Sequence, residues 1–264
     1  MLNWNDIWKW RMLVLRRSEI LKTEYWDSIA FKNENQSMSS LTDKQLEMIR
    51  VHPEDTLLEI GPGYGRLTIP LAKVVKKVTV VEPSKNMLSL LRENAERHGV
   101  YNIGFVNMRW EEVDVGKDVA QHDVVLASFS LLMSDLKAAF TKMDASAKKA
   151  VYLFLAADEW MPTEIQKILY GETLPITMSD HIIAYNLLYS MNIVANVTIL
   201  SYEAKTSFAN LQEAVEHALK IYNIPPAKDA DLKEYLGKVL VEDVGRYIYA
   251  RNRKVALIWW RKED

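Results

Sequence analysis

The sequence predicts a doubly wound α/β fold, in which helices cover both faces of a mostly parallel sheet. Short apolar segments alternate with helical ones between residues 56 and 155, as they do when crossover helices join parallel strands. The first apolar segment runs directly into a turn with three glycines, and a helix follows. A chain of 264 residues is long enough for one large domain of this kind with a small appendage.

Composition restricts the chemistry open to this chain. The absence of cysteine excludes disulfides, thiolate metal sites and a cysteine nucleophile. The net charge of −2 provides no overall field that would attract nucleic acid or a membrane surface. No signal peptide is visible, and no apolar run approaches the ~20 residues of a membrane-spanning helix. We therefore expect a cytoplasmic protein without a membrane partner.

Helices precede and interrupt the predicted sheet. Apolar residues at helical spacing indicate two helical pieces in residues 1–32 and a third helix over residues 41–51. The tryptophans of the first piece either pack on the domain or line a substrate pocket. Further helices are predicted at residues 65–75, 84–98, 135–143, 164–170 and 181–191. Ser84 is a favourable N-cap, and Gly99 lies where that helix ends.

Five short segments read as parallel strands, and the C-terminal region adds others. The five occupy residues 56–60, 77–81, 103–106, 124–127 and 150–155. Residues 196–203 alternate as a strand does, and two amphipathic helices follow at about 208–243. Residues 246–250 and 255–260 are interpreted as a β-hairpin that turns at Arg251-Asn252-Arg253.

The glycine-rich turn indicates a nucleotide pocket. Backbone without side chains can approach a ligand closely, and N–H groups at the start of a helix point toward it. Dinucleotide-binding turns follow the pattern G-x-G-x-x-G. Here the third glycine, Gly65, comes one position early, and Arg66 stands where that glycine is expected. Glu82 lies 21 positions after Gly61, at the end of the next strand, where a carboxylate can accept both hydroxyls of a ribose.

The segment Glu59-x-Gly61-x-Gly63-x-Gly65 resembles the first motif of the class I S-adenosylmethionine (SAM)-dependent methyltransferases. Residues 78–84 resemble the second strand of that family, which ends in the ribose-binding acid, and residues 122–127 resemble its fourth strand. The resemblance covers residues 50–160 well. It implies SAM as the methyl donor, S-adenosylhomocysteine as the product, and a seven-stranded Rossmann-like sheet whose last strand is antiparallel.

The resemblance also implies how the chain is divided. In small-molecule methyltransferases of this class, N-terminal helices often close over the cofactor, so residues 1–50 are expected to form a helical cap or lid. Residues 51–264 are expected to form the SAM-binding domain. Within it, residues 255–260 take the place of the antiparallel last strand, and the helices at about 208–243 form an insertion before that strand.

The resemblance places the candidate cofactor-binding residues in the glycine turn and after the second, third and fourth strands. They are Glu59, Gly61, Gly63, Gly65, Glu82, Pro83, Trp110, Glu111 and Ser128. Arg109 stands where the family usually has an aspartate that binds adenine. Trp110 can stack on the adenine while Glu111 replaces that acid; alternatively, Trp110 is a packed core residue.

Catalytic residues are harder to predict, because methyl transfer from a sulfonium is an in-line displacement. Positioning and desolvation can supply most of its rate, and a base is needed only when the nucleophile starts protonated. The candidates are Asp158 and Glu159, after the fifth strand, and His181 beside Asp180. Solvated loop carboxylates and a helix cap at Asp180 are the competing explanations. The five histidines are scattered without metal-ligand spacing, so no metal site is predicted.

The favoured function is methyl transfer to a small or medium-sized acceptor. Residues 57–71 also resemble the rRNA adenine dimethyltransferases, which carry Asn-(Leu/Ile)-Pro-(Tyr/Phe) after the fourth strand. This chain has Ala127-Ser128-Phe129-Ser130 there, so nucleic acid is the less favoured acceptor. The other alternative is a non-catalytic SAM-binding protein, motivated by Arg109 and by the lack of a clear catalytic signature.

Overall fold

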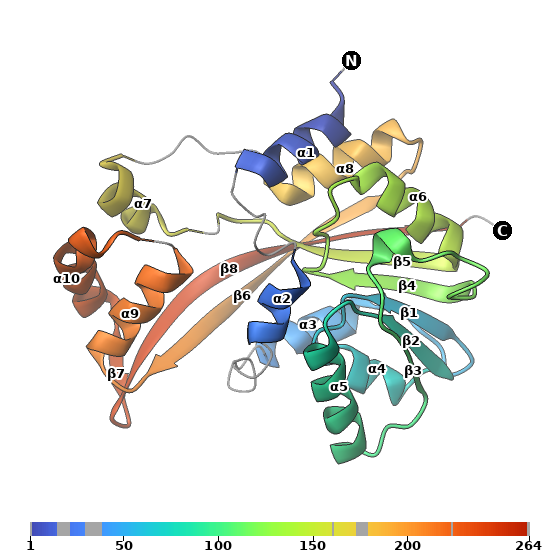
Figure 1. The fold of residues 1–264 in the computed structure, drawn as a ribbon, viewed down its shortest axis with the longest axis horizontal. Helices are drawn as coiled ribbons and strands as arrows, with labels where there is room; N and C mark the ends of the chain where they lie inside the picture. The colour runs from blue at the N-terminus through green and yellow to red at the C-terminus, as the bar shows by residue number, and fades with distance from the viewer. Residues whose placement is uncertain are drawn as a thin grey trace.

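A single mixed sheet forms the centre of the molecule (Figure 1). The computed structural model describes residues 2–14, 22–29, 39–159, 161–172, 179–222 and 224–262. The strand order is β3-β2-β1-β4-β5-β8-β6, with the short strand β7 paired to β8 outside this path. The parallel strands are β1 (Thr56–Ile60), β2 (Lys77–Val81), β3 (Ile103–Val106), β4 (His122–Ser128) and β5 (Ala147–Ala156). The predicted Rossmann-like fold is confirmed.

Helices cover both faces of the sheet (Figure 1). One face carries α1 (Trp4–Val14), α6 (Leu136–Ser146) and α8 (Asp180–Ser190). The other face carries α3 (Ser39–Met48), α4 (Thr68–Ala72) and α5 (Lys85–Arg97). Two short elements, α2 (Thr23–Ile29) and the 3-10 turn η2 (Trp110–Glu112), lie near the ends of the parallel strands. No helix among the described residues is long and apolar enough to cross a membrane.

Helix α4 is shorter than predicted. It begins at Thr68, whereas the pattern indicated a helix from residue 65. Gly65 has φ +95°, a left-handed conformation that a right-handed helix cannot include. Ser84 is the N-cap of α5, as predicted, because its hydroxyl oxygen accepts the Met87 N–H at 3.1 Å.

The last strand is antiparallel, as predicted, but the hairpin expected at Arg251-Asn252-Arg253 is wrong. Strand β8 (Arg246–Arg261) is continuous over 16 residues and pairs antiparallel with both β5 and β6 (Asn196–Phe208). The polar tripeptide suggested a turn by composition alone. In the structure Arg251 and Arg253 alternate with exposed neighbours, as a strand with two different faces requires. The actual hairpin joins β7 (Val241–Asp243) to β8 through Val244 and Gly245, both at positive φ.

Strands β6 and β8 project beyond the carboxyl edge of the parallel strands. Strand β5 ends at Ala156, opposite Val255, so the preceding residues of β8 pair with β6 and β7 instead. We call residues 201–208 of β6 and residues 246–254 of β8, which lie beyond Ala156, the ribbon. It carries a lobe with its own apolar core, built from α7 (Thr163–Tyr170), α9 (Leu211–Ile221), the turn η3 (Pro226–Lys228) and α10 (Asp229–Val239) (Figure 1). Helices α9 and α10 occupy the predicted insertion before the last strand.

Helix α1 is an integral part of the main core. Trp8 is completely buried, and its indole Nε1–H donates to the Met133 carbonyl oxygen at 2.8 Å.

We predict that Trp8→Ala lowers the free energy of unfolding by about 3–5 kcal/mol, because it leaves a large cavity and an unpaired carbonyl. The control is Trp10→Ala, since Trp10 is 65% exposed on the same helix; we expect a change within about 0.5 kcal/mol. Urea denaturation measures both, and equally small losses would contradict this packing.

Candidate active site

The largest concentration of predicted site residues lies at the carboxyl ends of β1, β2 and β4. The strand order reverses between β1 and β4, and ligands bind at such switch points in open α/β sheets. A pocket at this edge is lined by Thr23, Trp26, Glu59, Ile60, Gly61, Pro62, Gly63, Tyr64, Arg66, Leu67, Val81, Glu82, Pro83, Met87, Arg109, Trp110, Glu111, Ser128, Phe129, Ser130, Leu132 and Met133. Eight of the nine candidate cofactor-binding residues are among them; Gly65 is not.

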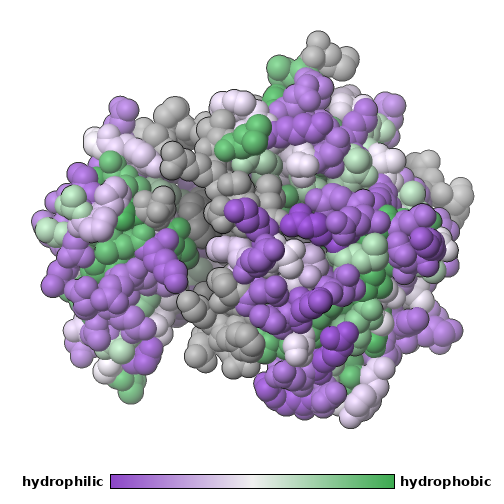
Figure 2. Space-filling model, viewed as in Figure 1, coloured by the Kyte–Doolittle hydropathy of each residue, from purple (hydrophilic) through white to green (hydrophobic). Residues whose placement is uncertain are grey.

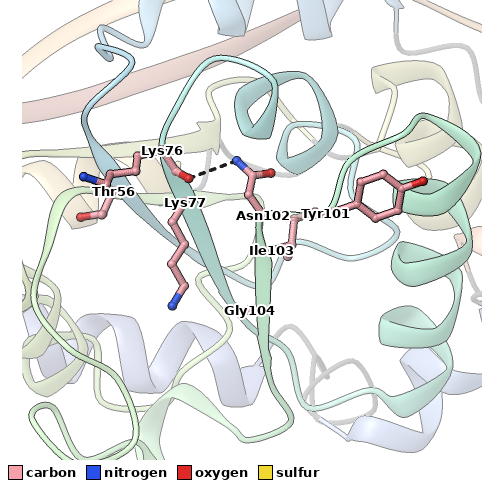
Figure 3. A pocket seen from close by; sticks show the side chains of 7 residues that line it. All are labelled: Thr56, Lys76, Lys77, Tyr101, Asn102, Ile103 and Gly104. Carbon is pink, nitrogen blue, oxygen red and sulfur yellow. Dashed lines mark hydrogen bonds between the residues drawn. The ribbon is translucent and has the colours of Figure 1, made fainter.

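A second depression lies at the opposite edge of the sheet (Figure 3). Thr56, Lys77 and Ile103 line it at the amino-terminal ends of β1, β2 and β3. The Asn102 amide donates to the Lys76 carbonyl oxygen at 3.4 Å and to Val75 at 3.0 Å, which closes the loop after α4 (Figure 3). Its polar groups are thus used to hold the loops, and it contains none of the predicted site residues.

The three glycines of the turn occupy two different structural environments. All have positive φ, which favours glycine. A Cβ at Gly61 would lie 2.4 Å from the Ser130 Cβ, and a Cβ at Gly65 would lie 2.1 Å from the Leu91 Cδ1. A Cβ at Gly63 would meet nothing within 4 Å. Gly61 and Gly65 therefore allow close packing, whereas Gly63 borders open space in the pocket.

Glu82 connects the end of β2 to this turn. Its carboxylate accepts the Ser84 N–H at 3.0 Å and the Gly63 N–H at 3.3 Å, and only 6% of the residue is exposed. Burial raises the pKa of Glu82, while the two backbone N–H groups favour its ionised form. The carboxylate thus lies beside the glycine turn at the end of β2, and its contact with a ribose stays a prediction.

Glu59 is a second buried carboxyl group on the pocket wall. Its Oε2 accepts the Thr68 hydroxyl at 2.6 Å, and 2% of the residue is exposed. Burial raises its pKa to about 7, against the opposing effects of Thr68 and of the nearby Arg66 guanidinium. Such a group responds to a charged ligand by gaining or losing a proton near neutral pH.

Arg66, which replaces the expected glycine, organises a network that sequence patterns did not reveal. Its Nη1 donates to Gln45 Oε1 at 2.7 Å and to the Thr42 hydroxyl at 2.8 Å, both on α3. The completely buried Gln45 then donates to Ser128 Oγ at 3.1 Å. Burial lowers the pKa of Arg66. The network fixes α3 to the loop after β4, and its members come from three distant parts of the chain.

Helix α2 covers the end of the pocket near Glu82. The Asp27 carboxylate accepts the Ser84 hydroxyl at 2.6 Å and the Asn86 N–H at 3.1 Å, which anchors α2 to the N-terminus of α5. Thr23 and Trp26 consequently line the pocket. The expected cap of residues 1–50 is thus divided, because α1 packs on the sheet face while α2 and α3 flank the pocket.

The loop after β4 has an unusual backbone. Phe129 has φ +56°, which is rare for a bulky residue, and 37% of it is exposed at the pocket. Its N–H donates to the Phe154 carbonyl oxygen at 2.9 Å, and the Ser130 hydroxyl donates to the Ile60 carbonyl oxygen. These bonds hold a conformation that would otherwise relax, and such strain is frequent at functional sites.

Trp110 is a packed core residue that also borders the pocket. It lines the pocket, yet only 2% of it is exposed, and its indole N–H reaches the Ala139 carbonyl oxygen at 3.4 Å. The Lys142 ammonium lies 5.4 Å from its ring centroid. Glu111 is exposed at the rim. The adenine contact assigned to these residues stays a prediction.

The three candidate catalytic residues do not line the pocket. Asp158 accepts two hydrogen bonds from the Arg253 guanidinium, at 2.7 and 2.9 Å. Glu159 is exposed and accepts from the Gln166 amide at 2.7 Å. His181 hydrogen-bonds Ser179 and the backbone of Ala156, and burial lowers its pKa. Within the described part of the chain, no group of three or more metal-ligating side chains occurs.

Comparisons with known proteins indicate a methyltransferase domain. Residues 57–150 match a family model described as a methyltransferase domain. An uncharacterised protein of Haemophilus influenzae is 28% identical over 242 residues, which cover 89% of this chain and 88% of that protein. The ribosomal RNA small subunit methyltransferase A of Desulforapulum autotrophicum is 37% identical over 57 residues, which cover 22% of this chain. The match covers 20% of the length of that relative.

Solved structures resemble the chain over most of its length. A putative methyltransferase of Bacillus halodurans superposes with a TM-score of 0.57 at 15% identity, covering 86% of this chain and all of that one. The structure of DhpI in complex with S-adenosylhomocysteine superposes with a TM-score of 0.51 at 13% identity, covering 93% and 98%. At these identities the likeness shows a shared fold.

Gly63 and Gly99 form a matched pair for testing the pocket. Both have positive φ, and a Cβ at either would meet nothing within 4 Å. We expect Gly63→Val and Gly99→Val each to lose on the order of 1–2 kcal/mol of stability from the left-handed backbone. Only Gly63→Val should abolish SAM binding, because its side chain enters the pocket. Calorimetric titration with SAM distinguishes the two variants. Equal affinities for SAM in both would show that SAM does not bind at this turn.

The pKa of Glu59 predicts a pH dependence. A cationic ligand favours the ionised carboxyl group, so SAM affinity should increase as the pH rises through about 7, by at most about tenfold per pH unit below the pKa. Glu59→Gln should flatten this dependence, whereas Glu96→Gln, an exposed acid on α5, should preserve it. Titrations between about pH 6 and 8 measure the slopes, and parallel profiles for Glu59→Gln and the wild type would contradict the assignment.

Proposed function

We propose that this chain, which belongs to the class I SAM-dependent methyltransferases, transfers the methyl group of SAM to a small or medium-sized acceptor. The acceptor would bind between the pocket at the carboxyl edge of the sheet and the projecting ribbon. One observation carries this proposal: β6 and β8 extend past the edge at which the pocket lies, and they hold a helical lobe opposite it (Figure 1).

The residues of the pocket suit the cofactor. SAM carries a sulfonium and an ammonium group, and two buried carboxyl groups, Glu59 and Glu82, face the cavity. Glu82 would accept hydrogen bonds from the ribose hydroxyls, as the family resemblance implies. Gly63 leaves open the space into which the ligand would extend. Trp26 and Met87 supply apolar wall on the side of α2 and α5.

The chemistry requires little of the side chains. When bound, SAM supplies a methyl carbon that accepts a lone pair of the acceptor while the carbon–sulfur bond breaks and its electrons remain on sulfur, leaving S-adenosylhomocysteine. None of the three candidate bases lines the pocket, so we assign to the chain positioning and exclusion of water. Phe129 and Ser130, on the constrained loop after β4, are the residues that we assign to that positioning.

RNA is the second candidate acceptor. It is supported by the resemblance of residues 57–71 to the rRNA adenine dimethyltransferases and by the similarity to an rRNA methyltransferase, although that similarity covers only about a fifth of this chain. The loop after β4 favours a small acceptor, because Ala127 and Ser130 stand where those enzymes have the Asn and the aromatic residue that grip the target base. Ser128 lines the pocket, and its hydroxyl oxygen accepts the Gln45 amide at 3.1 Å.

A pair of acid variants tests the cofactor assignment. Glu82→Ala should weaken SAM binding by about 1–3 kcal/mol, because the ribose hydroxyls lose their acceptor. Glu96→Ala, an exposed acid on α5, should leave the affinity unchanged. Calorimetry measures both. If wild-type protein binds neither SAM nor S-adenosylhomocysteine, the function proposed above is wrong.

The acceptor class is tested with SAM carrying a tritiated methyl group. Wild-type protein is incubated with cellular RNA and, separately, with the small-molecule fraction of a cell extract. We expect label to appear in the small-molecule fraction. Efficient labelling of the RNA would instead favour the second candidate, and SAM binding without label in either fraction would favour a non-catalytic role.

A further inference from the structure

One face of the ribbon presents two guanidinium groups among phenols. Strand pairing sets Tyr202 opposite Arg253, Ala204 opposite Arg251 and Thr206 opposite Tyr249. Side chains of directly opposed residues lie on the same face of an antiparallel pair. Tyr222, from the end of α9, joins them, because its hydroxyl lies 3.5 Å from the Arg251 Nη1. We call Tyr202, Tyr222, Tyr249, Arg251 and Arg253 the ribbon cluster.

The ribbon cluster lies between two apolar cores. Farther along the same face of β8, Val255 and Leu257 belong to the core beneath α3, α4 and α5. In the other direction, Tyr247 and Tyr249 pack against the core of the lobe. Arg251 and Arg253 fall between, just beyond the carboxyl end of β5. Figure 2 shows the lobe on the left and the main body on the right, with hydrophilic residues over much of both surfaces.

The cluster is also continuous with the proposed cofactor pocket. Tyr202 packs against the core that includes α3, and it lies close enough to Arg66 for the two to interact electrostatically. Arg66 lines the pocket. On its other side, Tyr202 lies opposite Arg253 in the strand register. The phenol of Tyr202 therefore connects the cofactor pocket with the arginines of the ribbon.

The two arginines differ in their partners. Asp158 neutralises Arg253 through the two hydrogen bonds at 2.7 and 2.9 Å. Arg251 is also half-buried, but no described carboxylate lies within salt-bridge distance of it, and its recorded hydrogen bond is the long one to Tyr222. A partly desolvated guanidinium without a counterion is costly, and an anionic ligand would offset that cost.

The hydroxyl groups of the surrounding tyrosines can donate hydrogen bonds to a bound anion. Burial raises the pKa values of Tyr202, Tyr222 and Tyr249, so these groups stay protonated and able to donate. Tyr249 also hydrogen-bonds Tyr235, with 3.1 Å between the hydroxyl oxygens. Two carboxylates lie near the cluster: Asp158 is already occupied by Arg253 and by the Lys254 N–H, and Glu164 on α7 lies close enough to Tyr249 to raise its pKa. The cluster thus offers one uncompensated cation and several donors.

We propose that the ribbon cluster binds an anionic group of the methyl acceptor, a carboxylate or a phosphate, with Arg251 as its principal ligand. This inference rests on the proposed function, since it takes the ribbon as one wall of the acceptor site. A guanidinium suits both groups, because its planar N–H donors match two oxygens at once. The position of Arg251, half-buried between two cores, favours a small anion over the backbone of an RNA.

Arg251→Gln is the central test, with Arg246→Gln as its control. Both arginines lie on β8, but Arg246 is exposed at the far end of the strand and donates to Ser207. Benzoate and inorganic phosphate serve as separate probes for a carboxylate and a phosphate, titrated by calorimetry into protein saturated with S-adenosylhomocysteine. We expect at least one probe to bind, with affinity reduced about tenfold or more by Arg251→Gln, the loss of one charged hydrogen-bonding partner. Arg246→Gln should bind the probe like the wild type.

The remaining outcomes separate this inference from the proposed function. Arg251→Lys keeps the positive charge and should bind the probe better than Arg251→Gln. If Arg251 had a purely structural role, the probe affinities of these two variants would not depend on the charge. All these variants should bind S-adenosylhomocysteine like the wild type, and failure of the wild type to bind it would count against the proposed function. Normal S-adenosylhomocysteine binding with no bound probe, with equal probe affinities in all variants, or with tighter binding of a short RNA than of either probe would overturn the anion site alone.

Discussion

The turn at residues 61–65 tolerates no side chain at two of its three glycines, and the arrangement of the site depends on that constraint. The loop after β4 packs on Gly61, and α5 packs on Gly65, so a Cβ at Gly61 would collide with the Ser130 Cβ and a Cβ at Gly65 with the end of the Leu91 side chain. Both neighbours are therefore fixed relative to the end of β1. Gly63 alone remains open, and the space beside it is where we place the cofactor. Close packing on two sides thus defines the opening on the third.

Segments that are distant in sequence complete the site by forming hydrogen bonds with its buried polar groups. Arg66 is satisfied by Thr42 and Gln45 from α3, and the N-terminus of α5 is satisfied by Asp27 from α2. A buried charge without such partners costs several kcal/mol. Docking of the N-terminal helices therefore stabilises the pocket walls. The segment that is expected to form a cap or lid thus contributes hydrogen bonds to the frame of the pocket.

Local sequence patterns predicted the fold because each pattern has a local cause. Strands β1 and β2, the glycine turn and the cap at Ser84 follow from apolar runs, left-handed backbone and side-chain capping. The hairpin expected at residues 251–253 was wrong, because Arg251 and Arg253 are stabilised by Asp158 and Tyr222, which lie far away in sequence. Gln45 and Asp27 gave no signal for the same reason, since their roles exist only in the folded chain.

The geometry assigns the methyl donor and the acceptor to different parts of the chain. The parallel strands hold the methyl donor, while the ribbon and its lobe face the same edge from outside and hold the acceptor. A crystal structure with S-adenosylhomocysteine tests this most directly. We expect its ribose hydroxyls within hydrogen-bond distance of Glu82 and its sulfur facing the ribbon. A ligand bound elsewhere, or a sulfur closed off from the ribbon by the main domain, would contradict this division.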